Sequence, residues 1–227
     1  NINELTKSEF LKHGEKYPRL LDFCKFSEQG KELKLPELKA KYAIIDFDFY
    51  EDTVILSTGI QVLQYRYFGG KIAAEPIGWL GSYRDIIRCL VIWNHWLYIV
   101  VDREVHVWDL RKFEEVKQKI NNEEEELGSK LSLQQKKDIF ATAKKQEINL
   151  DEIAKCVNVV QITEGKRTEA ALILGVQNNV QIFEISEDGN LDNSPTNLTG
   201  HEGGVYCLES NNQGIYSGSF DNTIKMW

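Results

Sequence analysis

Short apolar runs separated by tight polar turns occupy most of the chain after residue 40. Four segments share one pattern: a run of alternating apolar and polar residues, a turn of a few residues, a second such run, and an aromatic residue at its end. A period of two bounded by turn residues is typical of antiparallel β-hairpins. We therefore predict hairpins that pair residues 53–58 with 60–66, 96–101 with 104–109, 169–175 with 179–185, and 214–219 with 223–227.

The four predicted hairpins recur at a regular distance. Their terminal aromatic residues are Tyr65, Trp108, Phe183 and Trp227, and neighbouring ones are 43, 75 and 44 residues apart. A period of about 40–45 residues indicates repeats of four strands each. The 75-residue distance fits the same period if about 30 residues are inserted between the second and third repeats.

The last repeat carries the most specific residues. Gly200-His201 precede three apolar runs, Asp221 lies in a tight turn, and Trp227 closes the repeat. This order resembles one repeat of the WD-repeat β-propeller family, whose name-giving dipeptide is also present as Trp108-Asp109. The resemblance implies an all-β fold, a partial WD-type β-propeller with one clear blade and three degenerate ones. Since such rings have roughly 4–8 blades, we expect further blades after Trp227, with a closed ring of four as the alternative.

The domain map has two parts. Residues 1–40 are predicted to form an N-terminal extension with a short helix, because Thr6 and Glu9 have the spacing of a capping box. The extension either packs on the rim of the propeller or donates an outer strand to it. Residues 41–227 are predicted to be β-propeller blades.

Residues 111–150 interrupt the blades with a different composition. They are rich in charged, helix-forming residues, and Ser132 and Gln135 have capping-box spacing before a modest apolar stripe. We predict a helical insertion outside the propeller core, with a helix near 132–146, mobility near 123–129, and no outer strand for blade two. It is either a solvated insertion or a docking arm for a partner, because insertions on rigid repeats often bind.

No residue set points to catalysis, a cofactor or a metal. The four histidines lie far apart in the sequence, and no phosphate-binding or dinucleotide-binding motif is present. In the family that the chain resembles, residues matching His201, Asp221 and Trp227 form a structural hydrogen-bond network with a hydroxyl. Ser217 or Ser219 would supply that hydroxyl, and the sequence does not choose between them because both share one strand face.

Three of the four cysteines, Cys89, Cys156 and Cys207, fall in the first strand of a predicted blade, and none belongs to a Cys-x-x-Cys pair. This placement favours reduced thiols packed in the core. We therefore expect an intracellular protein, either cytoplasmic or nuclear. No apolar run approaches the roughly 20 residues of a membrane span, so no membrane association is expected.

The resemblance implies a non-enzymatic scaffold or adaptor subunit of an intracellular multiprotein complex, with other proteins as partners. An RNA-associated subunit of a ribonucleoprotein-processing particle is the alternative, which the net charge of −8 disfavours. Two tryptophans at one predicted turn are candidate partner contacts, because Trp is enriched in binding hot spots. With two residues of the insertion, the candidate contacts are Trp93, Trp96, Phe140 and Lys144.

Overall fold

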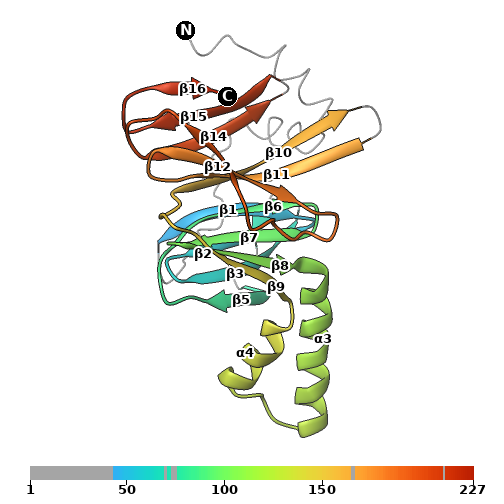
Figure 1. The fold of residues 1–227 in the computed structure, drawn as a ribbon. Coiled ribbons are helices and arrows are strands. Elements are labelled where there is room, and N and C mark those ends of the chain that lie inside the picture. Colours follow the sequence, from blue (N-terminus) through green and yellow to red (C-terminus); the bar gives the residue numbers. More distant parts are fainter. Residues whose placement is uncertain (1–42, 69–70, 73–75, 165–166, 212) are drawn as a thin grey trace, which may run out of the picture.

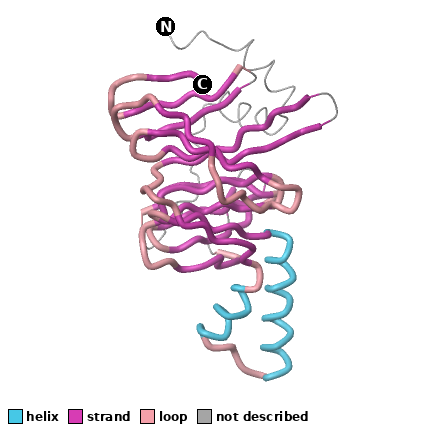
Figure 2. The backbone as a smooth tube through the Cα atoms, in the orientation of Figure 1, coloured by secondary structure: helices cyan, strands magenta, loops and turns pink. Residues whose placement is uncertain are grey.

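A computed structural model describes residues 43–68, 71–72, 76–164, 167–211 and 213–227. The N-terminal extension predicted over residues 1–40 lies outside them. The described residues form four antiparallel sheets, and their helices are confined to one projecting segment (Figures 1 and 2). Neither of these helices combines the length and apolar character that crossing a bilayer demands.

Each sheet is one blade, with its strands in sequence order from the inner to the outer edge. Blade one contains β1 (Ile44–Tyr50), β2 (Thr53–Thr58), β3 (Gln61–Phe68) and β5 (Gly78–Ser82), and the short β4 (Lys71–Ile72) pairs with the end of β3. Blade two contains β6 (Ile87–Trp93), β7 (Trp96–Val101), β8 (Glu104–Asp109) and β9 (Lys144–Asn149).

Blade three contains β10 (Cys156–Glu164), β11 (Arg167–Gly175), β12 (Asn179–Ile185) and β13 (Thr196–Thr199). Among the described residues, blade four consists of β14 (Val205–Asn211), β15 (Gly214–Ser219) and β16 (Ile224–Met226). The four predicted hairpins are confirmed, since β2 pairs with β3, β7 with β8, β11 with β12 and β15 with β16, all antiparallel.

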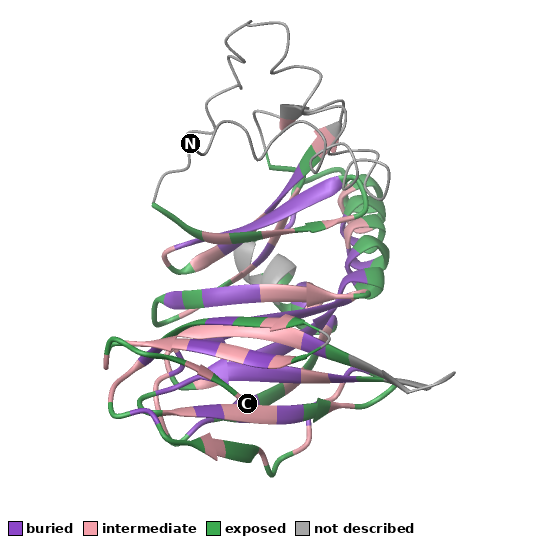
Figure 3. Ribbon diagram, turned by 90° about the horizontal axis from the view of Figure 1, so that it is seen from above, coloured by how far each residue is buried: buried purple, intermediate pink, exposed green. Residues whose placement is uncertain are grey.

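The inner strands hold neighbouring blades together. Strand β1 contacts β6, β6 contacts β10, and β10 contacts β14. The buried side chains lie between successive blades, and Figure 3 shows them concentrated on the middle strands. Burial of these facing apolar surfaces is the main stabilising contribution.

Polar side chains link blade one to blade two. Alternation along β1 points Asp46 and Asp48 toward β6, where their carboxylates accept hydrogen bonds from the backbone N–H groups of Leu90 (2.9 Å) and Ile92 (2.7 Å). Burial raises the pKa of Asp48, while the hydrogen bond from Ile92 partly offsets that rise. The two carboxylates satisfy β6 N–H groups that have no strand partner on that side, which fixes the position of one blade on the next.

The inserted segment differs from the prediction in one part. Helices α3 (Leu110–Leu127) and α4 (Leu133–Ala141) form the predicted helical pair, and Ser132 caps α4 through a capping box with Gln135. Residues 144–149, however, form β9, the outer strand of blade two. The prediction of a helix to 146 and of no strand here was wrong. Only Ile148 of β9 is buried, so the strand lacks an apolar alternation and pairing with β8 decides its conformation.

The helices also pack on the core, where the sequence predicted them to lie outside it. Phe113, Val116 and Ile120 are buried on one face of α3, in the same cluster as Phe140 of α4 and residues of blades one and two. The helix continues through Leu127 and ends at Gly128, whose φ of 60° is left-handed. The predicted mobile stretch over 123–129 is therefore helical for most of its length.

Candidate interaction site

A hydrogen-bond network closes blade four. The Nδ1–H of His201 donates to Asp221 Oδ2 at 2.7 Å, and the Ser217 hydroxyl donates to His201 Nε2 at 2.8 Å. The indole N–H of Trp227 donates to Ser217 Oγ at 2.8 Å. Ser219 belongs instead to the turn, where its hydroxyl donates to the Gly203 carbonyl at 2.8 Å. The structure thus places Ser217, rather than Ser219, against His201.

The Asp221 carboxylate is held in its charged form. Hydrogen bonds from the Thr223 hydroxyl (2.6 Å), from the Glu202 backbone N–H (3.0 Å) and from His201 keep the pKa of Asp221 well below its usual value. Serine, histidine and aspartate thus follow one another as in a hydrolase, but Ser217 is buried and its oxygen accepts from Trp227. No substrate can approach that oxygen, so the arrangement stabilises the blade and provides no exposed nucleophile.

Blade two replaces this network with a shorter one. In blade two, Leu90 of the inner strand pairs with Ile99, and in blade four the equivalent Leu208 pairs with Ser217. Ile99 therefore occupies the position that Ser217 has in blade four. Tyr83 precedes β6 by four residues, as His201 precedes β14. The Trp108 indole N–H donates directly to the Tyr83 hydroxyl at 3.0 Å. A phenol therefore supplies the acceptor that histidine and serine supply together in blade four.

Blade three dispenses with polar groups at the same positions. Its register places Leu174 where blade four has Ser217, and Phe183 where it has Trp227. Leu150 stands six residues before Cys156, as His201 stands six residues before the equivalent Cys207. Leu150, Leu174 and Phe183 are buried in one cluster. The equivalent positions thus hold hydrogen-bonded polar side chains in blade four, a mixture of polar and apolar side chains in blade two, and only apolar side chains in blade three. In each blade, no buried donor or acceptor at these positions lacks a hydrogen-bond partner.

This comparison predicts the cost of removing His201. We expect His201→Ala to destabilise the chain by about 1–3 kcal/mol, because Ser217 and Asp221 lose the imidazole as their hydrogen-bond partner. A triple variant built on blade three, His201→Leu with Ser217→Leu and Trp227→Phe, should recover part of that loss. Chemical denaturation of both variants measures it, and a triple variant less stable than His201→Ala would contradict the equivalence.

The four candidate partner contacts have different environments. Trp96 and Phe140 are 2% and 7% exposed, so neither offers the accessible side-chain surface that their prediction as partner contacts implies. Trp93 is partly exposed beside the inner strands of blades three and four, and its indole N–H has no hydrogen-bond partner. Lys144 is partly exposed on β9 and forms an ion pair with Glu147. Trp93 and Lys144 thus remain accessible candidates.

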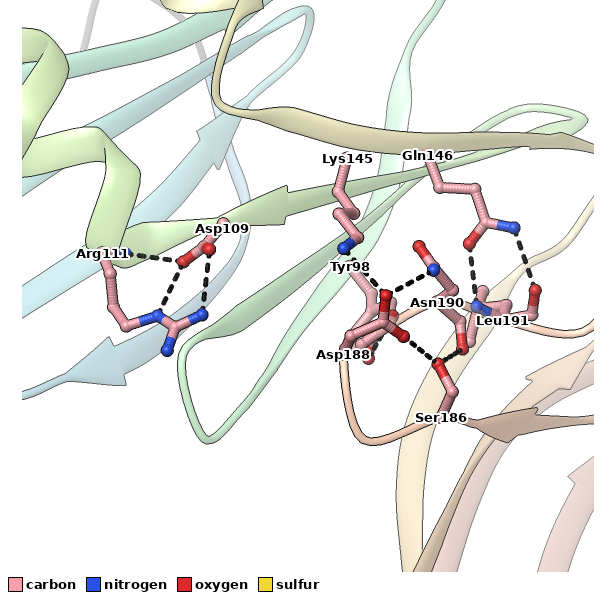
Figure 4. Close-up of polar contacts among 10 residues, drawn as sticks. Tyr98, Asp109, Arg111, Lys145, Gln146, Ser186, Asp188, Asn190 and Leu191 are labelled. Carbon is pink, nitrogen blue, oxygen red and sulfur yellow. Dashed lines mark hydrogen bonds and ion pairs between the residues drawn. The ribbon is translucent and has the colours of Figure 1, made fainter.

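Trp96 instead anchors a loop of blade three. The Lys145 ammonium and the Arg111 guanidinium lie 5.5 and 5.4 Å from the Trp96 ring, and the backbone of Gly189 approaches the same ring closely. The Tyr98 hydroxyl donates to the Gly189 carbonyl at 3.1 Å. Figure 4 shows the adjacent contacts, in which Lys145 pairs with Asp188 and Gln146 exchanges two hydrogen bonds with the Leu191 backbone. We call residues 186–191, the first part of the connection from β12 to β13, the clasp loop.

The Trp108-Asp109 dipeptide joins the blade to its insertion. Asp109 is the N-cap of α3, and its carboxylate accepts from the Arg111 backbone N–H and from the Arg111 guanidinium (Figure 4). Burial alone would raise the pKa of Asp109, but the hydrogen bonds from Arg111 outweigh it and lower that pKa. The aspartate that ends blade two's third strand thus also starts the inserted helix.

Comparisons with known proteins agree with this geometry. The family model described as WD domain, G-beta repeat matches residues 193–227. The chain has a β-propeller fold, and its last repeat matches a WD repeat. It is similar to the crystal structure of the computationally designed Ika4 protein, with a TM-score of 0.52, 14% identity, and coverage of 87% of this chain and 98% of that one. The all-β propeller prediction is therefore confirmed.

A natural propeller has the same fold. The WD40 β-propeller domain of Doa1 matches with a TM-score of 0.53 and 13% identity, over 82% of this chain and 51% of that one. The chain thus spans about half of the solved Doa1 chain. No curated protein matches the chain. At these identities the likeness concerns the fold alone.

Proposed function

We propose that this propeller is a non-enzymatic scaffold, an adaptor subunit of an intracellular multiprotein complex. WD40 propellers generally mediate protein–protein interactions. The observation that supports this role most directly is the helical arm, which we define as α3 with α4. Its apolar face is anchored in the core of blades one and two, and the opposite face projects into solvent (Figure 3).

The solvent face of α3 carries the exposed basic residues Arg111, Lys112 and Lys119 in its first half, and it is acidic toward its end. Glu115, Glu125 and Glu126 are exposed on α3. The anchored helix holds the neighbouring exposed residues Glu125 and Glu126 as a preorganised acidic surface at its end, which favours association with a basic segment of another protein. The same charge repels phosphate groups and thus disfavours the alternative of an RNA-associated subunit.

A charge-reversal variant tests the arm. We expect Glu115→Lys with Glu125→Lys and Glu126→Lys to keep the melting temperature nearly unchanged, because exposed substitutions cost within about 0.5 kcal/mol. The variant should lose at least one protein that the wild-type chain captures from cell extract, and nuclease treatment should not remove that protein from the wild type.

The control carries the same change of charge elsewhere. Asp151→Lys with Glu184→Lys and Glu187→Lys alters exposed acidic positions outside the arm and should retain every partner. Equal partner sets for both variants would show that the arm is not the interaction surface. Partners lost on nuclease treatment would favour the RNA-associated alternative.

A further inference from the structure

A cleft of about 540 Å³ lies between blades one and two, where the helical arm rejoins the propeller. Its walls come from β5 and the residues after it, from β8 and β9, and from the end of α4. We call it the inter-blade cleft. Five of the residues that line it carry the argument: Tyr83, Glu104, His106, Lys144 and Glu147.

His106 lines the cleft, and one of its ring nitrogens has no hydrogen-bond partner. The side chain is almost fully buried, and its Nε2 lies 2.9 Å from a carboxylate oxygen of Glu104. Its Nδ1 has no hydrogen-bond partner and lies 3.6 Å from a carboxylate oxygen of Glu147. A buried polar atom without a partner is rare, because it loses its hydration without compensation.

The missing partner must be a hydrogen-bond donor. Burial, assisted by the neighbouring charge of Lys144, lowers the pKa of His106 and keeps its imidazole neutral near pH 7. Since Nε2–H donates to Glu104, Nδ1 carries a lone pair. Nδ1 and the Glu147 carboxylate are therefore two adjacent acceptors, with Glu104 as a third on the other side of the ring.

We propose that the inter-blade cleft binds an arginine side chain of a protein partner, and this rests on the proposed role in protein interaction. A guanidinium presents N–H donors in a planar fork, which can serve His106 Nδ1 and Glu147 together. The ring of Tyr83, which packs against His106 at 4.8 Å between centroids, provides an aromatic surface beside the fork. Arginine prefers such surfaces because it stacks on aromatic rings.

Other ligands fit these groups less well. An anion would meet the carboxylates of Glu104 and Glu147 and be repelled. A metal ion would need at least three suitably placed ligands, and no such group occurs among the described residues. A lysine ammonium carries a compact charge without the planar fork that two adjacent acceptors select.

Lys144 occupies part of the site in the free chain. Its ammonium pairs with Glu147, and its side chain is 28% exposed, so it can turn outward when an arginine enters. Lys144 is thus a competitor for Glu147. Removing its charge should strengthen arginine binding, whereas removing the charge of Glu147 should weaken it.

The test uses acetyl-Gly-Arg-Gly-amide and the same peptide with citrulline or lysine in place of arginine. Binding to the full chain is followed through the imidazole C–H resonances of the histidines, each assigned by substitution. We expect the arginine peptide to shift the His106 resonance saturably, in the millimolar range for so small a ligand. The neutral citrulline peptide should bind at least about tenfold more weakly.

Matched variants give opposite results under the proposal. Glu147→Gln should weaken the arginine peptide by about tenfold, and Lys144→Met should tighten it, because a charge pair is lost in one case and a competitor in the other. Glu202→Gln, an exposed glutamate on blade four, should leave the affinity unchanged. Acidification should weaken binding to the wild type, since a proton on Nδ1 removes the acceptor.

Equal affinity for arginine and citrulline peptides would overturn the proposal, as would shifts that leave His106 unchanged or a Lys144→Met variant that binds no better. Equal affinity for the lysine peptide would also overturn it, because the fork would then play no part. These measurements use purified chain and model peptides. If the charge-reversal variant of the arm kept all its partners in cell extract, that outcome would count against the proposed scaffold surface but not against arginine binding in the cleft. If the arginine peptide failed to bind, the result obtained with the arm variant would still stand.

Discussion

Substituting Gly189 by alanine is expected to destabilise the chain by about 2–5 kcal/mol, the sum of a left-handed backbone penalty and of overpacking against Trp96. Gly189 has a φ of 79°, and a Cβ placed there would lie 2.2 Å from a ring carbon of Trp96. Trp96 cannot retreat, because it is buried beneath Arg111 and Lys145. The clasp loop would have to lift from blade two, and chemical denaturation would record the loss.

Gly128 provides the matched control for this substitution. It also has a left-handed backbone, with a φ of 60°, but nothing lies within 4 Å of the Cβ that alanine would add. Gly128→Ala should therefore cost only the backbone penalty of about 1–2 kcal/mol. If the two variants were equally stable, contact between the clasp loop and Trp96 would not hold blades two and three together.

The blades were the most predictable part of the fold because their chemistry is local. Each predicted hairpin consists of short apolar runs bounded by turn residues, and the first strands of two of them, β2 and β7, are buried at every position. The outer strand β9 has the sequence Lys144 to Asn149 with Ile148 as its only apolar residue. An edge strand needs no apolar alternation when its backbone pairs with β8. The strand conformation of residues 144–149 is therefore set by backbone hydrogen bonds to β8, which is distant in the sequence, and the local pattern could not predict it.

The network of blade four could be predicted only through its resemblance to a known repeat. Tyr83, which plays the corresponding part in blade two, was missed because no histidine precedes that blade. A signal was present, since Tyr83 stands four residues before β6 just as His201 stands four residues before β14. Counting back from each inner strand would have found it, whereas searching for identical residues could not.

The acceptors of the inter-blade cleft illustrate a different limit. Glu104 and His106 lie on β8, and Glu147 lies on β9 beyond the helical arm. Alternation predicts that Glu104 and His106 share a strand face. Their meeting with Glu147 depends on the register of β8 with β9, in which His106 lies opposite Glu147. That register follows from a strand that the sequence did not reveal.

The helical arm was predicted to be a detachable insertion, and its core contacts lead to a different expectation. Phe113→Ala should destabilise the chain by about 3–5 kcal/mol, as expected for truncating a buried phenylalanine in a packed core. Phe113 is 1% exposed and stacks on Phe140 with 4.9 Å between ring centroids. Phe140 in turn meets Trp79 of blade one, so the cavity would open between the arm and the propeller.

Leu127→Ala is the control on the same helix, because Leu127 is 62% exposed and lies at the far end of α3. It should change stability by less than about 0.5 kcal/mol. Urea unfolding of both variants, with strand and helix signals followed separately, distinguishes two cases. If the arm is part of the core, Phe113→Ala lowers the midpoint of both signals together, because packing couples helix and blade. If the helix signal alone shifted, the arm would unfold independently, and its anchoring in blades one and two would contribute little to the stability of the propeller.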